Sequence, residues 1–369
     1  MRAVRTVAPL WWAAHVPAGV FGRTHSDWIR LGSGYSVEKR QRSARLKVLA
    51  ALLGLTLLPA CSSLPWFGRT IELPLAPWPG YEYFYLAWKK GLAEQRGLRM
   101  NVRDFADPQA IVHAYLRGEL QLAQLTTVEA VDICHRLPRR CPVVVLVLDE
   151  SRGADMVAAR PGIETVGGLR GARIAVTPST LGPYVLSRAL QRAGLALSDV
   201  TIVPMPLGGM AGALQRQAVE AAAFFPPYSD YAIRAGLARR LFDSRAIPGE
   251  IFDVLVVDPD VATHRRKELA LLLETWQAAH DLAERDPDST DLLMSTREGL
   301  SVSRFRQAEE GLLYPDLSAQ VNLLKPGGVL ERNLAAVQDV QVALGLIEPG
   351  TPLPRVDDQP LRQALRAAP

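Results

Sequence analysis

The segment Arg117-Gly118-Glu119-Leu120-Gln121-Leu122-Ala123 returns later in the chain in a related form, Arg216-Gln217-Ala218-Val219-Glu220-Ala221-Ala222. Each copy ends a helix-like segment and begins an apolar segment typical of a strand. Strands are predicted to start near residues 69, 98 and 120, and again near 172, 200 and 219. The similar spacing predicts two β-α-β-α-β units, and hence two lobes with parallel or mixed sheets and right-handed crossovers.

Strand and helix patterns alternate through both units. The strands are expected over 69–75, 98–105 and 120–125, and over 172–177, 200–203 and 219–225. The helices between them are expected over 82–95, 108–117, 183–193 and 209–217. From about 261 to 346 the chain reads as helical, with predicted helices over 267–285, 303–312 and 330–344.

Two unbroken apolar segments, 143–148 and 252–257, lie outside the repeated units. A strand without polar alternation is buried on both faces, so these segments are expected to carry the chain out of lobe one and back into it. The prediction is lobe one over 69–156 and 252–348, and lobe two over 157–251. The tail, 349–369, is rich in proline and charge and is expected to fray.

Residues 1–60 have the pattern of a leader. Basic residues at 39, 40, 42, 45 and 47 precede an uncharged segment, 48–58, that is too short to cross a bilayer as a permanent helix. This predicts a secretory signal and a working protein that begins near residue 61, outside the cytoplasm, with 61–68 as a tether. Residues 1–36 fit such a signal poorly, so translation begins nearer Val37 or this part is a cytoplasmic extension.

The end of the leader, Leu58-Pro59-Ala60-Cys61, resembles the lipobox of bacterial lipoproteins. In that family cleavage precedes the cysteine, whose thiol carries diacylglycerol, and two or more acyl chains anchor a protein stably. The resemblance implies a protein of the bacterial cell envelope, anchored to the membrane at its periplasmic face through Cys61. The alternative is an ordinary signal in which Cys61 has no role.

The positive charge of the chain lies in the leader. Residues 1–60 carry nine Lys or Arg and two acidic residues, a net charge of +7, whereas the whole chain carries +4. Residues 61–369 therefore sum to −3, and the pI of about 9.0 reflects the leader. This removes the main support for nucleic-acid binding.

Cys134 and Cys141 are the cysteines beyond Cys61, and they flank a turn-like segment that contains Pro138. In an oxidising compartment the alternatives are a disulfide that fixes this turn and two inert thiols. The neighbouring His135 cannot complete a tetrahedral metal set with them. No metal and no cofactor is expected.

Common enzyme signatures do not appear beyond residue 61. We find no G-x-S-x-G, H-E-x-x-H or P-loop pattern. The glycine-rich segment Gly167-Gly168-Leu169-Arg170-Gly171 precedes its strand, whereas a dinucleotide-binding loop follows one. His280 is interpreted as a surface or core residue of a helix. The sequence therefore favours a protein that is not an enzyme.

Candidate ligand contacts lie in the loops that follow the predicted strands, since open α/β sheets bind ligands at the carboxyl ends of strands. These loops offer aromatic rings and hydroxyl groups. The candidates are Trp78, Tyr81, Tyr83, Thr126, Thr127, Ser179, Thr180 and Tyr228. The alternatives are an aromatic loop that packs on its own helix and, for Ser179 and Thr180, a plain helix cap.

Acidic residues gather where the chain is expected to cross between lobes. Asp149, Glu150 and Asp155 follow the outgoing strand, and Glu250 and Asp253 lie at the return. Carboxylates favour cations or donor-rich heterocycles, whereas helix-start hydroxyls suit an oxyanion. We take Asp149 and Asp155 as candidate acceptors for a ligand donor, with hinge hydrogen bonding as the alternative. Of these two groups we give the carboxylates more weight, so we expect the ligand to be a small nitrogen heterocycle or an amine.

Several motifs together resemble those of the substrate-binding proteins of ABC importers. They are Trp78-Pro79-Gly80-Tyr81-Glu82, Gly118-Glu119-Leu120-Gln121-Leu122-Ala123, Thr180-Leu181-Gly182-Pro183-Tyr184 and Phe224-Phe225-Pro226-Pro227-Tyr228. Over about residues 70–345 the chain is most similar to the branch for nitrate, sulfonates, taurine and thiamine-pyrimidine precursors. The motif Gly-Glu-Val-Asp, common in that branch, is replaced here by Gly118-Glu119-Leu120-Gln121. This departure leaves the ligand unassigned.

The resemblance implies the type II periplasmic-binding-protein fold, two α/β lobes that close on a ligand about two crossing strands. It implies a monomer that delivers a small molecule to a membrane permease with its ATPase. The aromatic candidates and Tyr228 would contact the ligand, and the hydroxyl candidates would hydrogen-bond it. Alternatives are a lipid-anchored sensor of the same fold, or an enzyme like the eukaryotic branch that makes the thiamine pyrimidine with Lys and His.

Overall fold

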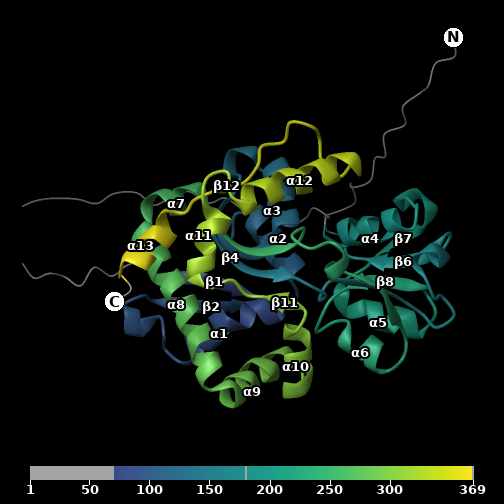
Figure 1. The fold of residues 1–369 in the computed structure, drawn as a ribbon, viewed down its shortest axis with the longest axis horizontal. Coiled ribbons are helices and arrows are strands. Elements are labelled where there is room, and N and C mark those ends of the chain that lie inside the picture. The colour runs from purple at the N-terminus through teal and green to yellow at the C-terminus, as the bar shows by residue number, and fades with distance from the viewer. Residues whose placement is uncertain (1–69, 179–180, 368–369) are drawn as a thin grey trace, which may run out of the picture. The chain divides into compact units, whose positions relative to one another are not determined.

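The strands of the two predicted units are present, and each unit contributes to sheets of its own (Figure 1). The computed structural model describes residues 70–178 and 181–367. The expected leader, tether and Cys61 lie outside these residues, as do Ser179 and Thr180.

Lobe one contains a two-stranded parallel sheet and a five-stranded sheet. In the larger sheet the strand order is β11-β4-β10-β3, and β12 pairs with β4 in parallel. The strands are β1 (Ile71–Leu75), β2 (Met100–Asp104), β3 (Leu122–Thr126), β4 (Val143–Ser151), β10 (Phe252–Val257), β11 (Leu312–Leu313) and β12 (Arg355–Val356). Every residue of β4 and β10 is buried, which confirms the prediction for the two apolar segments.

The helices of lobe one come from both ends of the described chain. The helix predicted over 82–95 ends earlier, at Lys89, and Gly91 follows with a φ of +64° that L side chains rarely adopt. The helices are α1 (Glu82–Lys89), α2 (Pro108–Leu116), α3 (Thr127–Arg136), α7 (Pro259–His264), α8 (Arg266–Arg285), α9 (Pro287–Glu298), α10 (Val302–Glu309), α11 (Leu317–Leu324), α12 (Val329–Ala343) and α13 (Gln359–Ala367).

Lobe two, drawn in teal in Figure 1, contains one mixed sheet with the strand order β7-β6-β8-β5-β9. Strand β6 pairs in parallel with β7 and with the central strand β8, whereas β5 pairs antiparallel with β8 and β9. The strands are β5 (Met156–Ala159), β6 (Arg173–Val176), β7 (Thr201–Pro204), β8 (Ala221–Phe224) and β9 (Arg239–Asp243). The helices are α4 (Leu181–Arg192), α5 (Leu207–Gln215) and α6 (Asp230–Arg234).

The chain crosses between the lobes after β4 and returns before β10. Met156, which the sequence prediction assigned to lobe one, begins β5 in lobe two. The two crossings are hydrogen-bonded to each other: Ser151 Oγ lies 2.8 Å from Ser244 Oγ, which also accepts from the backbone N–H of Gly153 at 2.6 Å. The crossings therefore form one hydrogen-bonded segment between the lobes.

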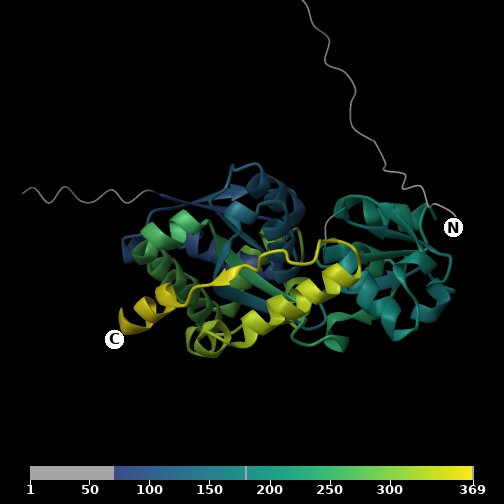
Figure 2. The ribbon, with the colours of Figure 1, turned by 90° about the horizontal axis from the view of Figure 1, so that it is seen from above.

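The C-terminal tail, expected to fray, is ordered instead. β12 extends the sheet of lobe one beside β4, and α13 packs on α8 with Leu361 and Ala364 buried. Figure 2 shows this segment in yellow, returning from α12 toward the C-terminus. The expectation was wrong because it weighed proline and charge over the apolar spacing of Leu361 and Ala364, which share one face of a helix.

Candidate functional site

A cavity is lined by side chains from both lobes. Its empty volume is about 420 Å³, part of it open to solvent. Most lining residues follow the carboxyl ends of strands, as expected for open α/β sheets. They are Trp78, Tyr81, Pro108, Gln109, Thr126, Glu129, Asp155, Thr177, Leu181, Leu207, Phe225 and Asp253.

Asp253 lies at the centre of a row of polar residues that crosses three strands. β10 runs between β3 and β4 and pairs Asp253 with Thr126 on one side and with Asp149 on the other. The Tyr81 hydroxyl donates to Asp253 Oδ1 at 2.5 Å, and the Trp78 indole N–H donates to Asp149 Oδ2 at 3.0 Å. Two aromatic residues of one loop thus hold two buried carboxyl groups beside the cavity.

Glu129 and Asp155 add two further buried carboxyl groups to the cavity wall. Glu129 belongs to a capping box at the start of α3: its Oε2 accepts from the backbone N–H of Thr126 at 3.0 Å and from the Thr126 hydroxyl at 3.1 Å. Asp155 lies on the outgoing crossing, where its backbone N–H donates to Ser151 Oγ at 3.2 Å. The acidic cluster, defined as Glu129, Asp149, Asp155 and Asp253, therefore combines a helix start, two strands and a crossing.

Burial raises the pKa of every member of the acidic cluster, because a low-dielectric environment disfavours the charged form. The pKa rises to about 7 for Glu129 and Asp149 and to about 6 for Asp155. The pKa of Asp253 rises well above its ordinary range, through burial and then the nearby charge of Asp149. When both groups are ionised, Asp149 Oδ1 and Asp253 Oδ2 have no hydrogen-bond donor among the described residues, whereas a proton on Asp253 bonds the two carboxyl groups to each other.

The acidic cluster has no positively charged partner in the cavity wall: no Lys, Arg or His is among the described residues that line it. Within the same part of the chain, no group of three or more His, Cys, Asp or Glu side chains is arranged to hold a metal ion. Carboxylates of this kind can accept hydrogen bonds from an ammonium group or from several N–H donors. The site is chemically suited to a small cation or a donor-rich ring.

Gly80 lets the aromatic loop approach the acidic cluster. A Cβ built at this position would overlap Asp149 Oδ2 and lie 2.9 Å from Trp78 Nε1. The hydrogen bond between Trp78 and Asp149 thus occupies the space that a side chain at residue 80 would need. The glycine at residue 80 therefore has a steric explanation, since a larger residue would not fit.

Aromatic contacts and one hydrogen bond join the lobes beside the cavity. The rings of Trp78 in lobe one and Phe225 in lobe two meet edge to face, with centroids 5.2 Å apart. Phe225 in turn contacts Tyr228 at 5.7 Å. The Tyr228 hydroxyl then reaches back to lobe one and donates to the backbone carbonyl of Ala106 at 2.8 Å.

The structure brings some of the predicted site residues together and leaves others apart. Trp78, Tyr81, Thr126 and Asp155 line the cavity. Asp149 is not among the lining residues but accepts from Trp78 and pairs with Asp253. Among the described residues that line it, Tyr83, Thr127 and Tyr228 do not occur. The predicted roles of Ser179 and Thr180 fall outside the described residues.

Tyr83 belongs to a different cluster inside lobe one. Its ring stacks on His280 with centroids 3.5 Å apart, and its hydroxyl donates to Glu309 Oε1 at 2.7 Å. Burial lowers the pKa of His280 to about 3, so this imidazole is neutral. Tyr83 and Tyr81 differ in this way because residues two apart near a helix start face different directions.

Glu129, Asp253 and Phe225 line the cavity although none was a predicted site residue. For Glu129 the signal was present, because a glutamate three residues after Thr126 is a capping-box pattern that places its carboxylate beside that threonine. Asp253 was noted only as part of the acidic set at the return crossing. Its pairing with Asp149 depends on strand register, which the sequence alone does not define.

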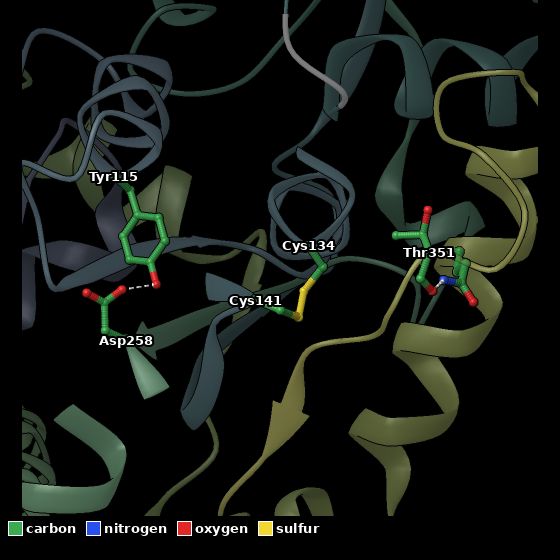
Figure 3. The surroundings of a disulfide bond; sticks show 6 residues. Tyr115, Cys134, Cys141, Asp258 and Thr351 are labelled. Carbon is green, nitrogen blue, oxygen red and sulfur yellow. Dashed lines mark hydrogen bonds between the residues drawn. A yellow bond between two sulfur atoms is a disulfide. The ribbon is translucent and has the colours of Figure 1, made fainter. Parts of the chain in front are cut away.

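A disulfide joins Cys134 and Cys141, whose Cα atoms are 4.3 Å apart (Figure 3). It ties the end of α3 to the segment that enters β4. The same segment is held by Arg140, which pairs with Asp258 at 2.8 Å, and Asp258 also accepts from the Tyr115 hydroxyl at 2.6 Å. Because α3 begins at the capping box and β4 carries Asp149, the disulfide ties together the far ends of two elements that carry the acidic cluster.

Within residues 70–178 and 181–367, none of the helices combines the length and the apolar character that a bilayer crossing requires.

Comparison with known proteins identifies similar chains. A model of the NMT1-like family matches residues 69–295. A protein of Brucella abortus (strain 2308), described only as a binding protein, is 23% identical over 310 residues, which cover 82% of this chain and 94% of that protein.

Solved structures with the same fold include binding proteins and an enzyme. The alkanesulfonate-binding protein SsuA of Xanthomonas axonopodis pv. citri, bound to MOPS, has a TM-score of 0.64 and 18% identity, over 76% of this chain and 95% of that chain. The desulfurization enzyme DszB has a TM-score of 0.57 and 17% identity, over 80% and 99%. These similarities concern the fold, and they confirm the predicted two-lobed α/β fold of periplasmic binding proteins.

Proposed function

The chain belongs to the NMT1-like family, and on that basis we propose that it is the solute-binding component of an ABC importer. In this proposal the cavity between the lobes captures a small organic cation or a donor-rich nitrogen heterocycle. The protein works at the periplasmic face of the bacterial envelope, anchored through Cys61, and passes its ligand to a permease with its ATPase.

The acidic cluster is the observation that carries the choice of ligand. Three of its members, Glu129, Asp155 and Asp253, line the cavity, and the described lining residues include no basic side chain. Asp253 is 2% exposed, and when Asp149 and Asp253 are both ionised, the Asp253 oxygen that Tyr81 does not contact has no donor among the described residues. An ammonium or amidine-like N–H group would supply that donor and the compensating charge.

A sulfonate, the ligand class named for the Xanthomonas protein, is disfavoured by the same reasoning. An anion in this cavity would meet carboxyl groups with raised pKa values and no described cation. It could bind only with those carboxyl groups protonated. The sulfonate-binding neighbours therefore support the fold and the binding role, while the cavity chemistry supports a ligand of opposite charge.

The described cavity wall also favours binding over catalysis. DszB shows that an enzyme can have this fold, but no Cys, Ser, Lys or His is among the described residues that line the cavity. The buried His280 lies with Tyr83 in the separate cluster of lobe one. A capture protein needs only the hydrogen bonds, the ring contacts and the contacts between lobes.

Thermal unfolding with a ligand panel tests the proposal. The panel contains alkylamines, aminopyrimidines, thiamine precursors, alkylsulfonates and inorganic oxyanions at pH 7.5. A ligand at about 100 times its dissociation constant adds about 2.7 kcal/mol, which raises the midpoint by several degrees. We expect shifts with amines or aminopyrimidines that are lost in Asp253→Asn. Shifts with sulfonates alone, unchanged in Asp253→Asn, would contradict the proposed ligand class.

A further inference from the structure

A side branch of the cavity extends into lobe two. It shares Asp155, Thr177, Leu181, Leu207 and Phe225 with the main cavity. Its empty volume is about 220 Å³, part of it open to solvent, so it can hold only a compact group. Its other lining residues are Gly182, Val185, Ala223 and Phe224. The branch therefore lies between the first turns of α4 and the end of β8.

The inner wall of the branch is apolar. Val185, Ala223 and Phe224 are each no more than 3% exposed, and none of them offers a side-chain hydrogen-bonding group. The polar groups, Asp155 and Thr177, stand where the branch meets the main cavity. A polar substituent that entered the branch would lose its hydrogen bonds to water without replacement, whereas an apolar one would gain from leaving water.

Gly182 allows α4 to lie close to β6 at this point. A Cβ at residue 182 would come within 2.7 Å of both Thr177 Oγ1 and Val176 Cγ1. The approach brings the next turn of the helix, with Val185, over the wall formed by Ala223. The branch is thus a consequence of how α4 packs on the sheet.

We propose that the ligand is an amphipathic amine, with a cationic head at Glu129, Asp155 and Asp253 and a compact apolar group in this side branch. The inference rests on the proposed function and adds the second half of the ligand. Asp155 carries the geometric link, because the same carboxyl group lines both the main cavity and the branch. A head group bound to Asp155 directs its substituent toward Ala223 and Val185.

Titration calorimetry with n-alkylamines from methylamine to hexylamine tests the inference on the full-length protein. Burial of each methylene is worth about 0.8 kcal/mol, which corresponds to about a fourfold gain in affinity. We expect such gains over the first methylenes, followed by a plateau when the branch is full. Matched n-alcohols of the same length measure the contribution of the head.

The variant Ala223→Val places two methyl groups in the branch, and we expect the plateau to come at a shorter chain. Ala222→Val is the control, because Ala222 is also buried in β8, lies on the opposite face of the strand and lines neither space. Ala222→Val overpacks the same strand by the same two methyl groups as Ala223→Val. We expect its chain-length profile to match that of the unchanged protein.

The outcomes separate this inference from the proposed function. Amines that bind with equal affinity at every chain length, or a profile that Ala223→Val leaves unchanged, would overturn the branch assignment alone. Equal binding of alcohols and amines, or binding of alkylsulfonates with no binding of amines, would overturn the cationic head and with it the proposed ligand class. Chain-length dependence that requires the amine and is shortened by Ala223→Val would support both.

Discussion

The Tyr81 hydroxyl donates a hydrogen bond to Asp253 Oδ1 at 2.5 Å, with both side chains buried. This bond lowers the pKa of Asp253 against the larger upward effect of burial. An aromatic residue of the loop after β1 thereby opposes part of the effect that burial has on a carboxyl group of β10. In the proposed function, cation binding depends on this pair.

Tyr81→Phe is expected to weaken amine binding without removing a cavity-lining ring. Loss of the donor leaves Asp253 harder to ionise, and a net hydrogen bond of about 0.5–1.5 kcal/mol corresponds to a roughly twofold to tenfold loss of affinity. Titration with propylamine at pH 7.5 measures this loss of affinity. Tyr115→Phe is the matched control, since it removes a similar Tyr–Asp bond of 2.6 Å outside the cavity. Equal losses of affinity in both variants would contradict the assignment.

Amine binding should strengthen as the pH rises from about 5.5 to 8. Burial raises the pKa of Asp155 to about 6 and of Glu129 and Asp149 to about 7, so these groups hold protons in the lower part of this range. A cation favours the ionised carboxylates and displaces protons, and each proton released makes the affinity rise up to about tenfold per pH unit. Alkylamines, like lysine, stay protonated to about pH 10.

Calorimetry in buffers with different ionisation heats counts the protons released by propylamine. We expect a net release near pH 6.5, reduced in Glu129→Gln. An affinity that falls as the pH rises would show that protonated carboxyl groups, and hence an anionic or neutral ligand, suit the site better.

Gly80→Ala should destabilise the protein and weaken ligand binding together. The added Cβ would overlap Asp149 Oδ2, so the bond between Trp78 and Asp149 must shift. Overpacking of this kind costs about 1–3 kcal/mol, which chemical denaturation can measure. Gly208→Ala is the control: a Cβ there meets no atom within 4 Å, and alanine in α5 is expected to stabilise by about 0.5–1 kcal/mol. If Gly80→Ala left both the stability and the ligand affinity unchanged, the steric account of this loop would be refuted.

Tyr228→Phe should weaken ligand binding although Tyr228 lines neither the cavity nor its branch. The variant removes the bond to the Ala106 carbonyl that joins the two lobes, so the ligand-bound closed form is held less firmly. We expect a loss of about twofold to tenfold, seen mainly as faster dissociation in surface plasmon resonance.

The neighbouring Tyr231 is 46% exposed, and Tyr231→Phe serves as the control for Tyr228. Unchanged dissociation from Tyr228→Phe would mean that closure does not depend on this hydrogen bond.

The elements that could be predicted from the sequence are those encoded by local pattern. The unbroken apolar segments became β4 and β10 because burial on both faces needs no information about partners. The acidic set at the crossings was also visible. Its assembly around Asp253 was not, since the pairing with Asp149 and Thr126 follows from the register of three strands distant in the chain.

Side-chain direction explains why two predicted ligand contacts, Tyr83 and Tyr228, are not among the described residues that line the cavity. Tyr83 was grouped with Tyr81 because they are close in the sequence, but the start of α1 directs Tyr83 toward His280. Tyr228 was expected to contact the ligand, whereas its hydroxyl is used between the lobes. In both cases the loop was identified from the sequence, while the partner of the side chain depended on tertiary packing.

The sign of the ligand charge is the central claim, and a matched pair of probes tests it most directly. Propylamine and propanesulfonate share one carbon chain and differ in the charge of the head group. Titration of the protein with each at pH 7.5, and of Asp253→Asn in parallel, is expected to show binding of propylamine only, weakened by the substitution. Binding of propanesulfonate in preference to propylamine, maintained or strengthened in Asp253→Asn, would contradict the account.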